Sequence, residues 1–211
     1  QSVKEHLQNT AYRAKVFADS FNNGNYGYIA GLFHDIGKYS SMFQKKISCN
    51  SNDKVDHSTA GAIEINNAYK IFGKLLAYCI AGHHGGIPDG GSISDNPIDV
   101  SLNGRLKRKD QLPAYMSYKS EIDISNLPPI GLPDIKPLNK GGFSLSFFIR
   151  MIYSCLVDAD FLDTEGFMSM GKVDRSADYN FLLFNKKLST YISNFKNPEE
   201  DINKKRKEIL D

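Results

Sequence analysis

The distribution of histidine constrains this chain more than any other feature, because all five histidines lie within the first 84 residues. One is followed directly by an aspartate and another directly by a second histidine. A single histidine can have many roles, whereas a set with two such adjacent pairs is typical of metal sites, where imidazole is the commonest ligand. The pattern predicts a metal-dependent hydrolase. The five residues are His6, His34, His57, His83 and His84.

Apolar residues recur at three- and four-residue intervals through much of the chain, which is the period of an amphipathic α-helix. No segment of strand length shows an alternation of apolar and polar residues. We therefore predict an all-α fold. The predicted helices cover residues 7–21, 28–33, 39–47, 57–73, 74–83, 145–159 and 181–191.

The predicted helix boundaries place the histidines at or near helix ends. Asp56 can cap a helix that begins near His57. Gly37 breaks the chain just after the pair at 34–35, and Gly85 ends a helix just after the pair at 83–84. His6 lies at the margin of the first apolar stripe. Helices packed side by side could therefore bring these side chains together.

Residues 85–142 differ from the rest of the chain because glycine, serine and proline dominate them. The run LPPIGLP at 127–133 contains three prolines and cannot form a regular helix. We predict a loop-rich insertion with short helices at most. It either lines an open groove or covers the site, and the sequence leaves both alternatives open. The basic run at 105–109 is expected to be a solvated surface.

Length and composition limit the class of protein. The 211 residues suffice for one domain with a continuous core. No apolar run approaches the roughly 20 residues that cross a membrane, and no secretory signal is visible, so no membrane association is expected. A net charge of +2 does not by itself indicate nucleic-acid binding. Cys49, Cys79 and Cys155 form no CxxC pair, so we expect reduced thiols and a cytoplasmic protein.

The order of these residues resembles the HD superfamily of metal-dependent phosphohydrolases, whose fold is a helical bundle around a two-metal site. Four short motifs are similar to the HD nuclease domain of the type I CRISPR-associated nuclease-helicase, the Cas three family. These motifs are HDIGK at 34–38, HS at 57–58, HHG at 83–85 and DAD at 158–160. The resemblance covers about residues 1–165.

The resemblance implies a nuclease domain at residues 1–196 with the insertion 85–142 inside it. The charged segment 197–211 resembles the connector that leads to a helicase in this family. No GxxxxGK[ST] motif occurs, so the helicase itself is absent and the chain is expected to be an excised N-terminal domain.

The resemblance also implies how the metal ligands are divided. His6, His34, Asp35 and a late aspartate hold one metal, whereas His57, His83 and His84 hold the other, with Asp35 bridging the two. The late aspartate is either Asp158 or Asp160. Because successive helical residues rotate by about 100°, Asp160 falls on the buried face, and we favour it over Asp158.

A two-metal hydrolase needs ligands that hold two divalent ions about 3.5–4 Å apart. Histidine with aspartate suits Mn²⁺, Fe²⁺, Co²⁺ or Ni²⁺, and the number of imidazoles makes Mg²⁺ less suited. The predicted catalytic residues are Asp35, Lys38 and Ser58. Lys38 can meet a substrate phosphate as a point charge or be an exposed lysine in a turn, and Ser58 can bind that phosphate or support His57.

The resemblance implies hydrolysis of single-stranded DNA by a metal-activated water. In the family, that strand is displaced when a guide-RNA surveillance complex of the Cascade type pairs with foreign DNA during antiviral defence. The nearest enzymatic alternative is an HD-type phosphohydrolase of nucleotides or cyclic nucleotides. A protein-docking domain with structural metals is a further alternative, which the intact ligand set disfavours.

Overall fold

The structure is a computed structural model that describes residues 1–49, 54–133, 135, 141–172, 180–193 and 200–210. All regular elements of the described residues are helical, which confirms the predicted all-α fold class. The chain divides into two compact units, Gln1–Lys172 and Val173–Asp211. This division lies before the predicted domain boundary at 196/197, and the extent of the nuclease domain stays a prediction.

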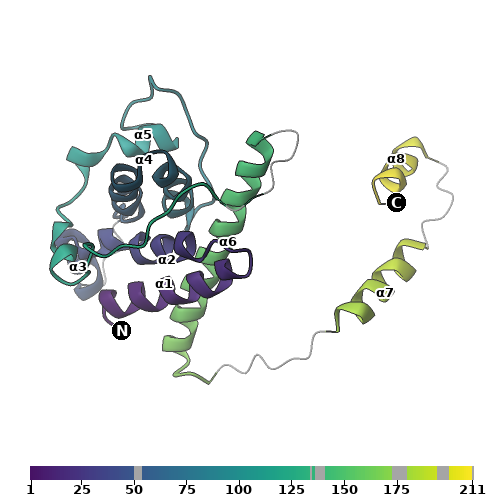
Figure 1. The fold of residues 1–211 in the computed structure, drawn as a ribbon, viewed down its shortest axis with the longest axis horizontal. Coiled ribbons are helices and arrows are strands. Elements are labelled where there is room, and N and C mark those ends of the chain that lie inside the picture. Colours follow the sequence, from purple (N-terminus) through teal and green to yellow (C-terminus); the bar gives the residue numbers. More distant parts are fainter. Residues whose placement is uncertain (50–53, 134, 136–140, 173–179, 194–199, 211) are drawn as a thin grey trace. The chain divides into compact units, whose positions relative to one another are not determined.

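The first unit holds all the predicted helices except 181–191, together with short helices inside the insertion (Figure 1). Its elements are α1 (Val3–Asp19), α2 (Gly24–Phe33), η1 (Ile36–Tyr39), α3 (Ser41–Ser48), α4 (Ser58–Gly82), α5 (Leu102–Leu106), η2 (Lys109–Gln111), η3 (Met116–Ser120) and α6 (Gly141–Met168). The second unit contains α7 (Phe181–Ser193) and α8 (Asp201–Leu210).

Helix α2 is the centre of the first unit and contacts α1, α4 and α6. Eight of its ten residues are buried, as expected for a helix with apolar residues on all sides. Two glycines let it approach α1 closely. A side chain at Gly31 would place Cβ 2.5 Å from Ala11 Cα, and one at Gly27 would place it 2.2 Å from the Ala14 carbonyl oxygen. These contacts hold the end of α2, where the pair at 34–35 lies, against α1.

Helix α4 contains a break, because Lys70 has φ 50° and ψ −120°. The sequence predicted two helices that meet between residues 73 and 74, so the predicted position of the break was wrong by three residues. Gly73 has a packing role instead, since a side chain there would place Cβ 2.2 Å from the Ile65 carbonyl oxygen. A glycine needed for close approach therefore resembled a helix terminator in the sequence.

The insertion 85–142 contributes to the core, although much of it is irregular. Tyr115 and Tyr118 are buried, and their hydroxyls donate to the two carboxylate oxygens of Glu64 over 3.1 and 2.8 Å. The prediction that the basic run 105–109 is a solvated surface was wrong for Arg105 and Arg108. Both are partly buried, and their nitrogens lie 3.6 and 3.1 Å from the carboxylate of Asp56.

In the second unit, α7 confirms the helix predicted over residues 181–191, and none of its residues is buried; most of its large apolar side chains are exposed. Helix α8 lies within the segment predicted as a connector, and that role stays a prediction. Residues 197–199 and 211 of the segment lie outside the described residues. Among the described helices, none has both the length and the apolar character required to cross a bilayer.

Candidate metal centre

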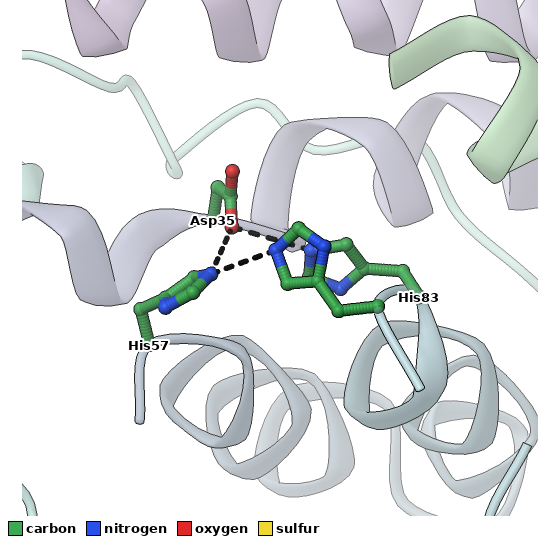
Figure 2. Close-up of side chains that lie close together, drawn as sticks. Asp35, His57 and His83 are labelled. Carbon is green, nitrogen blue, oxygen red and sulfur yellow. Dashed lines mark hydrogen bonds and ion pairs between the residues drawn. The ribbon is translucent and has the colours of Figure 1, made fainter. Parts of the chain in front are cut away.

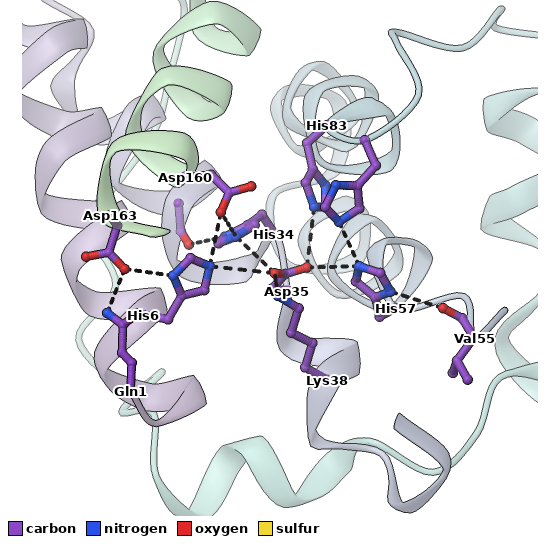
Figure 3. Close-up of polar contacts among 12 residues, drawn as sticks. Gln1, His6, His34, Asp35, Lys38, Val55, His57, His83, Asp160 and Asp163 are labelled. Atoms are coloured by element: carbon purple, nitrogen blue, oxygen red, sulfur yellow. Dashed lines mark hydrogen bonds and ion pairs between the residues drawn. The ribbon is translucent and has the colours of Figure 1, made fainter. Parts of the chain in front are cut away.

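The fold brings seven predicted metal-ligating residues into one cluster, which we call the metal centre (Figure 3). They come from the first turns of α1, the end of α2, both ends of α4 and the second half of α6. They form two groups that share Asp35, and within each group the nearest donor atoms lie within 4.8 Å of one another. Group A is His6, His34, Asp35 and Asp160; group B is Asp35, His57, His83 and His84.

Asp35 is completely buried and faces both groups with its two carboxylate oxygens (Figure 3). Figure 2 shows its contacts with His57 and His83 of group B. On the side of group A, Oδ2 lies 3.3 Å from His34 Nε2 and 3.7 Å from His6 Nε2. On the side of group B, Oδ1 lies 3.4 Å from His57 Nε2 and 3.3 Å from His83 Nε2. One carboxylate therefore has the position of a bridge between two cations.

The structure distinguishes the two aspartates that the sequence left as alternatives. Asp160 Oδ1 lies 3.1 Å from His6 Nε2 and 3.7 Å from His34 Nε2. Asp158 is exposed and belongs to neither group. Helix rotation accounts for this, since two residues along the helix turn a side chain by about 200°. Asp160 is thus the aspartate that α6 presents to the metal centre.

Three histidines of the metal centre donate Nδ1–H to a backbone carbonyl two or three residues earlier in the chain. Because a carbonyl oxygen only accepts, the proton lies on Nδ1, and the neutral ring has a free lone pair on Nε2. Each Nε2 faces Asp35. This arrangement is typical of metal-ligating histidines, whose orientation depends on the bond made by the other nitrogen. The bonds are His34 to Gly31 (2.7 Å), His57 to Val55 (3.0 Å) and His83 to Ile80 (2.8 Å).

His6 is oriented in the same way by Asp163, which sequence reasoning missed. Asp163 Oδ2 accepts from His6 Nδ1 over 2.8 Å and from Gln1 Nε2 over 2.7 Å (Figure 3). The carboxylate is 4% exposed. A signal was present in the sequence, because a residue three positions after Asp160 lies on the same face of a helix.

Five buried polar atoms of the metal centre make no hydrogen bond within the described part of the chain. Leaving a buried polar group without a hydrogen bond carries a free-energy penalty of about 1–3 kcal/mol, and of these atoms Asp35 Oδ2 has the ammonium of Lys38 beside it. Cations held between the carboxylate and the imidazoles would satisfy them, and a mixed set of nitrogen and oxygen donors suits divalent transition ions. The residues present therefore fit a pair of metals. The five atoms are His6 Nε2, His34 Nε2, His83 Nε2, Asp35 Oδ1 and Asp35 Oδ2.

The two groups differ in the direction in which their histidine pKa values are shifted. In group A, burial opposes the charged imidazole, yet contacts with Asp160, Asp35 and Asp163 raise the pKa of His6 to about 10. Burial likewise opposes protonation of His34, but the charge of Asp35 and a contact with Asp160 raise its pKa to about 9. Burial favours the neutral carboxyl of Asp35, but the charge of His34 holds its pKa well below the usual range.

In group B, the electrostatics favour the neutral form of two imidazoles, His57 and His84. Burial lowers the pKa of His57, and burial together with the charge of His83 lowers the pKa of His84 to about 4. The Nε2 atoms of His57 and His84 lie 2.8 Å apart. Since His57 donates through Nδ1, its Nε2 lone pair faces His84. Neutral imidazoles in this arrangement can act as ligands without first losing a proton.

Lys38 and Ser58 lie at the edge of the metal centre, and their catalytic roles stay predictions. Lys38 Nζ lies 2.5 Å from Asp35 Oδ2 and 5.8 Å from the centre of the Phe43 ring. Ser58 Oγ accepts from Arg105 Nη2 over 2.8 Å. Both residues can therefore reach the site, but each has a protein partner.

An open cavity of about 620 Å³ lies beside group B, and Ser58, His84 and Arg105 are among the residues that line it. Gly85 and Gly86 continue the lining, and a side chain at either position would meet no atom within 4 Å. The insertion supplies most of the other lining residues. The insertion therefore lines a solvent-accessible cavity, and His84 of group B forms part of the same cavity wall.

Comparison with known families agrees with this geometry. The sequence model for the HD domain matches residues 3–121, which is more than half of the chain. The matched span contains six of the seven clustered residues, and Asp160 lies beyond it. No curated protein matches the chain. HD domains are typically metal-dependent hydrolases that bind divalent cations. The imidazole and carboxylate groups of the metal centre are suitable ligands for such cations.

Proposed function

Because this chain belongs to the HD domain family, we propose that it is a metal-dependent nuclease that hydrolyses phosphodiester bonds in single-stranded DNA. The observation that carries the proposal is the shared carboxylate of Asp35. Its two oxygens face two separate sets of imidazoles, which is the arrangement expected of a two-metal phosphodiesterase.

Group A would hold one divalent cation and group B the other. When bound, such a pair lowers the pKa of water and neutralises charge on the phosphate. The proposed ions are Mn²⁺, Fe²⁺, Co²⁺ or Ni²⁺, because mixed imidazole and carboxylate sets suit them better than Mg²⁺.

The chain's own residues then have two tasks. The backbone carbonyls behind His34, His57 and His83 keep each Nε2 directed at the centre. Lys38, whose ammonium lies against Asp35, is close enough to stabilise negative charge on a phosphate that binds there. Cys79 and Cys155 are buried, so a covalent intermediate on either thiol does not enter the proposal.

We assign the activity to CRISPR interference, as part of antiviral defence in the cytoplasm. The support is the combination of HDIGK at 34–38, HS at 57–58 and HHG at 83–85, which resembles the Cas three family. In this proposal the substrate is the strand displaced by a guide-RNA surveillance complex. A helicase joined through the segment 197–211 would move that strand onward.

A second candidate function is hydrolysis of nucleotides or cyclic nucleotides. The cavity beside His84 favours it, because about 620 Å³ lies within the range of roughly 300–1,000 Å³ typical of small-molecule sites. The same metal centre would serve either substrate.

Circular single-stranded DNA tests the proposal, because it has no ends and reports internal cleavage only. The chain is incubated with Mn²⁺ and either this substrate or a panel of nucleotides and cyclic nucleotides. We expect the circle to be linearised and the nucleotides to persist. Hydrolysis confined to the nucleotides would contradict the nuclease proposal and support the second candidate.

The proposed partner is tested separately with a guide-loaded surveillance complex on target DNA. We expect cleavage to concentrate on the displaced strand. Equal cleavage of the same single strand with and without the complex would remove the support for CRISPR interference while leaving the nuclease activity in place.

A further inference from the structure

One side chain of the insertion contacts both ends of helix α4. At the start of the helix, Arg105 donates from Nη2 to Ser58 Oγ over 2.8 Å and from Nε to Thr59 Oγ1 over 3.0 Å. Near the end of the helix, it donates from Nη1 to the carbonyl oxygen of Ala81. All three nitrogens of one guanidinium are therefore engaged, and they join residues 58–59 to residue 81.

This connection requires α4 to fold back on itself. A straight helix of 25 residues would place its ends about 37 Å apart at 1.5 Å per residue, whereas one guanidinium spans only a few ångströms. The break at Lys70 makes the reversal possible and divides α4 into two arms, residues 58–69 and 71–82. The close approach of Gly73 to Ile65 packs these two arms together. Arg105 joins the arms at their open end.

The two ends joined by Arg105 carry the histidines of group B. His57 directly precedes the first arm, and His83 with His84 directly follows the second. We propose that Arg105 is a positioning residue that keeps His57 and the pair at 83–84 at the spacing needed to hold the second cation. It acts through the backbone of α4 and is not among the residues of either metal group.

The geometry of arginine matters for this role. Its planar fork presents donors in fixed directions and matches three acceptors at once, which a lysine ammonium on a flexible stem cannot reproduce. Asp56, whose Oδ1 lies 3.6 Å from Arg105 Nη2, balances the charge and also accepts from Thr59. The positive charge of Arg105 is thus paired with a carboxylate, and its three hydrogen bonds require the shape of a guanidinium.

Arg108 provides a matched control within the same insertion. It also forms an ion pair with Asp56, at 3.1 Å, and donates to the carbonyl oxygens of Pro97 and Asp99. None of these bonds reaches the second arm of α4. Replacing Arg108 therefore removes a partly buried cation from the insertion without removing the join between the arms.

The inference rests on the metal centre of the proposed function and is independent of the substrate. It is tested by Mn²⁺ titration calorimetry on the full chain, in two backgrounds that each remove one ligand from one group and leave the other group complete. The Asp160→Asn background retains group B, and the His84→Ala background retains group A. In the first background, Arg105→Met should weaken Mn²⁺ binding by about 10-fold or more, as observed when partners of metal ligands are removed.

In the His84→Ala background, Arg105→Met should leave the affinity of group A within about 2-fold, because Arg105 joins only the two ends of α4 and these carry group B. Arg108→Met should leave both affinities within about 2-fold, because Arg108 does not join these ends. Arg105→Lys should not restore the affinity of group B. An unchanged affinity of group B in Arg105→Met, or equal weakening of both groups, overturns the assignment.

Thr59→Val keeps the inference testable if the Arg105 variants do not fold. The substitution is nearly isosteric and removes the acceptor of Arg105 Nε, so we expect about 3-fold weaker binding by group B alone, a fraction of the effect of losing the whole fork. No change in Thr59→Val would then overturn the assignment. Failure of the wild type to cleave DNA while these affinities follow the expected pattern would contradict the nuclease proposal alone.

Discussion

Asp163 Oδ2 accepts a hydrogen bond from His6 Nδ1 over 2.8 Å, and this bond joins α6 to α1 across 157 positions of the sequence. It is the only one of the four Nδ1 bonds described for the metal centre whose acceptor is a side chain. Group A thus depends on a residue that a substitution can remove, whereas the backbone carbonyls behind His34, His57 and His83 cannot be removed in this way.

Asp163→Ala should weaken Mn²⁺ binding by group A by about 10-fold, because His6 loses the acceptor that sets its orientation. The measurement is titration calorimetry in the His84→Ala background, where group B lacks one of its ligands. Asp158→Ala is the matched control on the same helix, since Asp158 is exposed and belongs to neither group. Equal effects of the two substitutions would exclude an orienting role for Asp163.

Asp35→Ala should abolish cleavage of circular single-stranded DNA, because both metal groups share this carboxylate. We expect a loss of about 10³-fold or more, equivalent to about 4 kcal/mol of transition-state stabilisation. Circular dichroism should show that most of the helical content is retained. Residual activity close to that of the wild type would refute the bridging role.

Removal of metal should lower the thermal stability of the first unit. A ligand that binds only the folded state at about 100 times its Kd adds about 2.7 kcal/mol to the free energy of unfolding. We expect Tm to fall on treatment with EDTA and to recover with Mn²⁺. In Asp35→Ala, Mn²⁺ should change Tm little, and an equal rise in this variant would place the stabilising ion elsewhere.

Gly31→Ala should destabilise the fold by about 1–3 kcal/mol, because the new Cβ would lie 2.5 Å from Ala11 Cα and the backbone there must move. Urea denaturation measures the effect. Gly166→Ala in α6 is the control, since no atom lies within 4 Å of its added Cβ. A helical glycine replaced by alanine in open space should gain up to about 1 kcal/mol, so the two substitutions should have opposite signs.

Thiol reactivity should distinguish one cysteine from the other two. Cys49 is exposed, whereas Cys79 and Cys155 are buried. Burial raises the pKa of Cys155 to about 11 and raises that of Cys79 further, so neither forms a thiolate at neutral pH. A disulfide reagent should modify one thiol rapidly in the folded protein and three in guanidinium chloride. Rapid modification of three thiols without denaturant would contradict this packing.

The sequence allowed prediction of what local chemistry determines. Apolar periodicity identified the helices, and the residue types at their ends indicated that the histidines lie at helix termini or margins. Helix rotation alone favoured Asp160 over Asp158, because the direction of a side chain depends only on its position along the same helix.

Tertiary structure determined the features that depend on residues distant in sequence. Gly73 was predicted to end a helix, but it is the close approach to Ile65 that requires a glycine there. Arg105 was expected in solvent, but the reversal of α4 brings three acceptors to its guanidinium. Asp163 depends on α6 crossing α1. Helix period acts over a few residues, whereas burial and hydrogen-bond partners arise only when separate helices pack together.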